Sequence, residues 1–174
     1  MTVPTGHAIE PLNNTWETEA RFEQGDTANA LALMGRLWGP MVRPDNPFYT
    51  GTLWEFVYDD GDVKRAFDSL AHGWSAGPTQ QLSEYVLGIQ PVEPGYATWS
   101  VTPQLSDLAW AQGQVPTAYG PLLVKWAQDD QARAGAAGGH FHLEVTAPAG
   151  TRGEVWVPLS SADERVSHAL TPGA

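Results

Sequence analysis

The strongest constraint on the fold of this chain is a change in the spacing of its apolar residues at Pro94-Gly95. Before this point, apolar residues recur at helical spacing, once from about Thr27 to Trp38 and again after Ser75. After it, apolar and polar residues alternate in short runs that are separated by Gly, Pro and Asp. The sequence therefore predicts a helical part over residues 1–93 and a strand-rich part over residues 94–174.

Two helices are predicted in the first part. The first begins at Asp26 or Thr27, either of which offers an N-cap oxygen, and ends at Gly39-Pro40. The second begins around Ser75 to Pro78, because serine can cap a helix and proline suits its first turn. One apolar face of this second helix is expected to carry Leu82, Tyr85, Val86 and Ile89.

Five short strands are predicted in the second part, and strands at this spacing suggest an antiparallel β-sandwich. A ragged tail is expected over residues 160–174. The five predicted strands cover residues 96–101, 108–111, 122–126, 141–145 and 153–157.

The charge of the chain excludes several classes of partner. With 20 acidic and 9 basic side chains, the formal net charge is −11, so the field of the protein opposes binding to nucleic acid or to an anionic membrane surface. The absence of cysteine excludes disulfides and thiolate metal sites. Neither a signal peptide at the N-terminus nor a long apolar run is present, so a soluble chain is expected, without a predicted location.

Eight tryptophans are the most distinctive part of the composition. An indole ring supplies a large flat apolar face and one N–H donor, so it suits a protein core and the C–H face of a sugar ring equally well. Composition alone leaves both interpretations open.

The first candidate for chemistry is Glu55, which follows Trp54 in an aromatic-rich loop expected over residues 42–67. A carboxyl group against an indole in an apolar pocket is desolvated, and this can prepare it for proton transfer near neutral pH. The alternative is structural: this glutamate caps a helix or pairs with Arg36 or Arg43.

The second candidate is His72, in a glycine-rich turn that leads into the second predicted helix. A histidine at this place can orient a sugar hydroxyl, with Trp74 as a wall behind it. The alternative is a histidine whose ring bonds backbone carbonyls in a tight turn.

No metal or cofactor is expected. The run of Asp59, Asp60 and Asp62 around Gly61 lacks the ligand pattern of an EF-hand and is interpreted as a solvated turn. His140 and His142 share one face of a strand by period two, but two ligands without a third are weak evidence for a metal site. Neither a phosphate-binding loop nor a dinucleotide fingerprint is present, so nucleotide binding has no support.

Four stretches taken together resemble the C-terminal part of bacterial and fungal α-L-rhamnosidases, glycoside hydrolase family 78. Their order matches that family over about residues 25–158. The stretches are Leu37-Trp38-Gly39-Pro40-Met41, Gly51-Thr52-Leu53-Trp54-Glu55, residues 72–79 (HGWSAGPT) and residues 85–91 (YVLGIQP), the last followed by Pro94-Gly95.

The resemblance implies an α+β fragment, in which the terminal helices of an (α/α)6 barrel precede an antiparallel β-sandwich. It implies hydrolysis of terminal α-L-rhamnosides with inversion, which needs two carboxyl groups about 6.5–9.5 Å apart. In this sequence Glu55 matches the general base of the family and His72 a histidine that contacts the sugar. Trp54 and Trp74 are expected as pocket walls.

Enzymes of this family are several times longer than this chain, and their general acid lies in an earlier part of the barrel. The chain is therefore interpreted as a C-terminal fragment whose partners are an L-rhamnosyl substrate and the missing N-terminal part of the barrel. One alternative is a non-catalytic carbohydrate-binding or accessory module. Another is a fragment that completes a barrel supplied by a neighbouring polypeptide.

Overall fold

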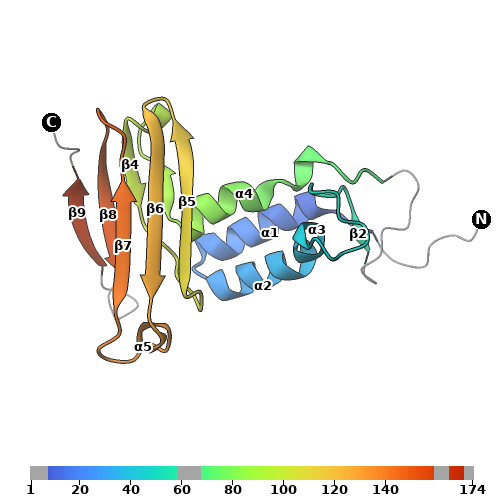
Figure 1. Ribbon diagram of the computed structural model, residues 1–174, viewed down its shortest axis with the longest axis horizontal. Coiled ribbons are helices and arrows are strands. Elements are labelled where there is room, and N and C mark those ends of the chain that lie inside the picture. The colour runs from blue at the N-terminus through green and yellow to red at the C-terminus, as the bar shows by residue number, and fades with distance from the viewer. Residues whose placement is uncertain (1–7, 59–67, 159–164, 171–174) are drawn as a thin grey trace, which may run out of the picture. The chain divides into compact units, whose positions relative to one another are not determined.

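The computed structural model describes residues 8–58, 68–158 and 165–170, and the chain divides into two compact units, residues 1–80 and 81–174 (Figure 1). The division lies 13 residues before the boundary expected at residue 93, because residues 82–91 take part in the second unit. Within the described residues, no helix is long and apolar enough to cross a membrane.

The first unit is built on an antiparallel pair of helices, which lie side by side in Figure 1. Buried residues recur four positions apart on each helix, Thr18 and Phe22 on the first and Ala30 and Met34 on the second. The elements of this unit are β1 (Ala8–Ile9), α1 (Pro11–Glu23), α2 (Thr27–Leu37), α3 (Gly39–Val42), β2 (Val57–Tyr58), η1 (Gly73–Ser75) and α4 (Gly77–Gln81), whose last residue belongs to the second unit.

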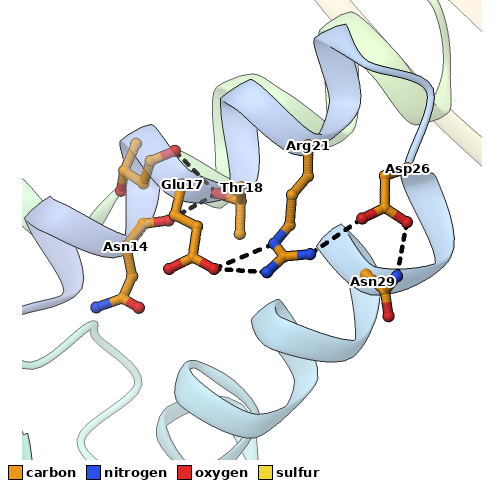
Figure 2. Close-up of polar contacts among 7 residues, drawn as sticks. Asn14, Glu17, Thr18, Arg21, Asp26 and Asn29 are labelled. Carbon is orange, nitrogen blue, oxygen red and sulfur yellow. Dashed lines mark hydrogen bonds and ion pairs between the residues drawn. The ribbon is translucent and has the colours of Figure 1, made fainter.

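The turn between α1 and α2 is held by a polar cluster (Figure 2). The guanidinium group of Arg21 donates to the carboxylate of Glu17 at 2.7 and 3.1 Å and to that of Asp26 at 3.0 Å. Asn29 donates to the other oxygen of Asp26 at 2.7 Å. The hydrogen bond to Glu17 is the main reason that the pKa of Arg21 is raised. One arginine therefore links the end of α1 to the start of α2.

The second unit contains two sheets. Strands β3 (Ile89–Pro91), β4 (Thr98–Val101), β8 (Arg152–Pro158) and β9 (Arg165–Leu170) form one of them in the order β3-β4-β8-β9. Strands β5 (Trp110–Thr117), β6 (Gly120–Gln128) and β7 (Phe141–Thr146) form the other. The remaining elements are the π-helix η2 (Leu82–Val86), the 3-10 helix η3 (Pro94–Tyr96) and α5 (Asp130–Arg133).

The segment from η2 to β3 connects the two sheets. The carbonyl of Val86 accepts a hydrogen bond from the buried indole of Trp126 on β6, at 2.8 Å, while Ile89 pairs with Val101 of β4. Gly88 between them has φ +78°, and a Cβ atom there would lie 2.2 Å from the backbone of Thr102. Only glycine fits this turn, because the conformation is left-handed and the two backbones touch.

The structure confirms the predicted helix at Thr27, adds one helix that was not predicted and corrects three expectations. Residues 11–23, which the pattern left unassigned, form α1. The expected ragged tail contains β9, which pairs with β8. Strands β4 and β8 are parallel, so the sheets are not purely antiparallel. Leu82 is exposed, although it was expected on the apolar face of the second helix. The N–H of Leu87 donates to the carbonyl of Leu82 in a π-turn, and this turn rotates the apolar face of the helix away from Leu82.

Tight packing between β4 and β8 gives a direct test of the second unit. A Cβ atom on Gly153 would lie 2.2 Å from the buried ring of Trp99, so Gly153→Ala should destabilise this sheet by about 1–3 kcal/mol. Faster amide hydrogen exchange in β4 and β8 would measure the effect.

The matched control is Gly35→Ala on the exposed side of α2, where the added Cβ meets nothing within 4 Å apart from neighbouring backbone of its own helix. Alanine should stabilise that helix by about 0.5–1 kcal/mol and slow its amide exchange. Unchanged protection of β4 and β8 in Gly153→Ala would contradict the packing described here.

Candidate functional site

Two backbone hydrogen bonds bring the two candidate residues together. The N–H of Glu55 donates to the carbonyl of Ser69, and the N–H of His72 donates to the carbonyl of Leu53, each at 2.8 Å. Residues 53–55 and 69–72 therefore run alongside each other, although 17 positions separate Glu55 from His72. Their side chains meet, with Nδ1 of His72 lying 3.8 Å from Oε2 of Glu55.

The carboxylate of Glu55 is held by a backbone donor. Its Oε2 accepts a hydrogen bond from the N–H of Ser69 at 2.9 Å. The side chain of Glu55 is 21% exposed and that of His72 is 33% exposed, so solvent reaches both. A fixed carboxylate that solvent reaches can take a proton from a bound water.

Trp74 packs against both candidates. Its ring lies over that of His72, with 4.3 Å between centroids, and its indole N–H donates to the backbone carbonyl of Glu55 at 3.1 Å. Phe56 meets the ring of Trp74 edge-on at 6.0 Å. Trp74 thus packs against His72, and its expected role as a wall of a sugar pocket stays a prediction.

Trp54 does not line the site, which corrects the expectation that it forms a wall. Its side chain is only 1% exposed, so no face of the ring is open to a ligand. Its carbonyl accepts a hydrogen bond from the hydroxyl of Ser75 at 2.5 Å, and Met41 Sδ lies 3.3 Å from its N–H. Among the described residues, no group accepts from its indole N–H. Trp54 therefore supports the site from the core.

Neither structural alternative for Glu55, a pair with an arginine or a helix cap, is seen among the described residues. Arg43 pairs with Asp45 at 2.6 Å, which raises the pKa of this arginine, and no ion pair within the described chain joins Glu55 to an arginine. Nor does Glu55 cap a helix, because its backbone donor, Ser69, lies in an irregular segment.

Two hollows in the first unit lie away from this pair. One, of about 300 Å³, is lined by residues between Gly35 and Asn46, and the other, of about 400 Å³, lies between β1, α2 and β2. Neither lining includes Glu55 or His72, whose side chains are partly exposed.

Of the residues considered as metal ligands, the two that the structure describes, His140 and His142, do not form a centre. Over the described ranges, no group of three or more His, Asp or Glu side chains could hold an ion. His140 contacts Asp129 at 3.1 Å, and His142 lies on β7 opposite Ala127. The predicted turn at Asp59, Asp60 and Asp62 lies outside the described residues.

Comparison with known proteins gives a consistent result. Residues 88–170 match the model of the bacterial α-L-rhamnosidase C-terminal domain. An α-L-rhamnosidase of Alteromonas sp. (strain LOR) is 28% identical over 102 residues, which are 56% of this chain and 10% of that protein.

Two solved structures resemble this chain as well. The family 78 rhamnosidase of Bacillus sp. GL1 aligns with a TM-score of 0.61 and 28% identity over 86% of this chain and 16% of its own. The α-L-rhamnosidase of Streptomyces avermitilis aligns with a TM-score of 0.57 and 21% identity, over 70% of this chain and 13% of its own. At this identity the likeness supports the fold alone.

These matches cover only a small part of each relative. The chain spans between 10% and 16% of the length of these three relatives. The family model covers the sheets of the second unit, and the Bacillus structure extends the likeness over most of the chain. By sequence and by fold, this chain resembles the C-terminal part of the α-L-rhamnosidases of glycoside hydrolase family 78.

Proposed function

We propose that this chain is the C-terminal part of an inverting α-L-rhamnosidase and that Glu55 is its general base. The observation that carries the proposal is the meeting of Glu55 and His72, which the sequence pattern had singled out separately, at 3.8 Å on an accessible surface. The likeness to rhamnosidases supplies the substrate class, a terminal L-rhamnosyl group.

The contacts of Glu55 suit a base. In the part of the chain that the structure describes, both contacts of its carboxylate use Oε2, so Oε1 is left to accept a proton from water. The oxygen of that water would attack the anomeric carbon on the face opposite the departing group, and this inverts the configuration. His72 and Trp74, which lie beside Glu55, would contact the sugar.

The second carboxyl group belongs to the part of the enzyme that precedes this chain. An inverting enzyme needs a general acid about 6.5–9.5 Å from the base, and the relatives extend far beyond the matched part. In this proposal α1 and α2 are the last hairpin of an (α/α)6 barrel, and the two sheets form the C-terminal sandwich. Trp16 on α1, which is 59% exposed, would be covered by the preceding helices.

A chimera tests the role of Glu55. This chain would replace the matching C-terminal part of the Bacillus sp. GL1 relative, and hydrolysis of p-nitrophenyl α-L-rhamnoside would be measured. Because a general base is lost, Glu55→Gln should lower kcat by about 10²–10⁴-fold. The isolated 174-residue chain should be nearly inactive, since it lacks the acid.

Glu23→Gln is the matched control, because Glu23 ends α1 on an exposed position of the same unit. Its kcat should equal that of the unmodified chimera. An active chimera whose kcat does not change in Glu55→Gln would remove this residue from the mechanism.

A second variant tests how Glu55 is positioned. Ser75→Ala removes the hydroxyl that donates to the carbonyl of Trp54 and leaves that buried carbonyl without its donor, at a cost of about 1–3 kcal/mol. The backbone N–H groups of Glu55 and His72 bond between residues 53–55 and residues 69–72. Their hydrogen exchange with solvent should then become faster.

Ser69→Ala serves as the comparison, because it removes only an exposed hydrogen bond from the N–H of Ala71 to the Ser69 hydroxyl, while the donor from Ser69 to Glu55 is a backbone N–H that alanine keeps. Exchange at the same two amides should be nearly unchanged. Equal effects of the two substitutions would show that the bond from Ser75 does not position Glu55.

A further inference from the structure

The outward face of the three-stranded sheet carries polar side chains that the fold itself does not use. On β6, Leu122, Val124 and Trp126 are buried, so the residues between them point to solvent. The register places Gln112 and Glu144 on either side of Lys125, and Gln114 and Thr146 on either side of Leu123. These two cross-strand rows lie next to each other on one face.

The two rows line a hollow of about 490 Å³. This volume lies within the range of about 300–1,000 Å³ that is typical of small-molecule sites. Wherever the structure describes the chain, no hydrogen bond or ion pair engages the side chains of Gln112, Gln114, Lys125 or Glu144. Their donors and acceptors are thus available to a ligand.

An exposed indole lies at the end of these rows. Trp110 on β5 is 63% exposed and stands opposite Ala127, which stands opposite His142. Residues of the same face alternate along a strand, so Trp110 and Gln112 point the same way. An exposed indole beside amide groups offers a flat apolar surface next to hydrogen-bonding groups.

The chemistry of this face fits a neutral saccharide. The hollow has one cationic and one anionic side chain, Lys125 and Glu144, so it carries no net charge, and the chain as a whole carries −11. An anionic ligand is therefore disfavoured. Sugar hydroxyls donate and accept hydrogen bonds, as the amides of Gln112 and Gln114 do, while the C–H face of a pyranose can stack on an indole.

We propose that this face of β5, β6 and β7 binds a neutral mono- or disaccharide, with Trp110 as the stacking platform and Gln112, Gln114, Lys125 and Glu144 as the polar contacts. The site lies wholly within the second unit and uses neither Glu55 nor His72. It gives the chain a binding function that does not depend on the proposed hydrolysis.

The test is a titration of the full 174-residue chain, with ¹⁵N-labelled tryptophan, with L-rhamnose, D-glucose and lactose. At least one sugar should shift the indole N–H resonance of Trp110 saturably in the millimolar range. Trp16 provides the internal control, because its ring is almost equally exposed but lies in the first unit. Its resonance should not follow the titration.

Two variants distinguish binding at this face from binding elsewhere on the chain. The double variant Gln112→Ala with Gln114→Ala removes polar contacts from an exposed face, so the chain should stay folded and its affinity should fall at least about tenfold, equivalent to about 1.4 kcal/mol. Glu55→Gln should leave the affinity unchanged, so failure of the hydrolytic proposal would not affect this result.

Three results would overturn the proposal. The first is the absence of any saturable shift at Trp110 with the three sugars. The second is unchanged affinity in the double glutamine variant. The third is broadening of the Trp110 resonance with protein concentration and not with sugar, which would identify this face as a contact between two copies of the chain.

Discussion

Buried hydrogen bonds from indole N–H groups are the interaction on which this structure depends. Four tryptophans donate to acceptors that are 19 to 52 positions away in the sequence, at 2.8–3.1 Å. Three of these bonds are buried, and the bond from Trp74 is part-buried. Each bond satisfies a polar group of a large apolar side chain and at the same time fixes a distant segment. The pairs are Trp38 with Ser75, Trp74 with Glu55, Trp99 with Thr151 and Trp126 with Val86.

The first two of these bonds build the candidate site. The indole of Trp38, at the end of α2, holds the carbonyl of Ser75, and the hydroxyl of Ser75 holds the carbonyl of Trp54. The next residue is Glu55, whose own carbonyl accepts from Trp74. A helix end thus positions an irregular loop through three successive bonds, so the carboxylate does not need regular secondary structure to be fixed.

The fold was predictable where the pattern was long and regular. Helix α2 and strands β6 and β7 have clear periods, and their positions agree with the sequence. Strand β3 has only three residues and follows a helical run, so no period marks it. Its place depends on pairing with β4 and on Gly88, which are tertiary features.

The site was predictable by residue type but not in its detail. The aromatic-rich loop pointed to Glu55 and the glycine-rich turn to His72, yet the pairing of their segments depends on backbone hydrogen bonds that leave no mark in the pattern. Trp54 lies next to Glu55 in the sequence, and Trp74 lies two positions after His72. Only tertiary packing determines that Trp54 is buried and that Trp74 contacts His72. Local sequence cannot separate two tryptophans in similar loops.

Buried hydrogen bonds from indole N–H groups hold the irregular segments in place, and the exchange rates of the indole protons measure this directly. In a chain with ¹⁵N-labelled tryptophan, the indole protons of Trp38 and Trp126 should exchange far more slowly than those of the exposed Trp16 and Trp110. Exchange at Trp38 and Trp126 as fast as at the two exposed rings would contradict the account.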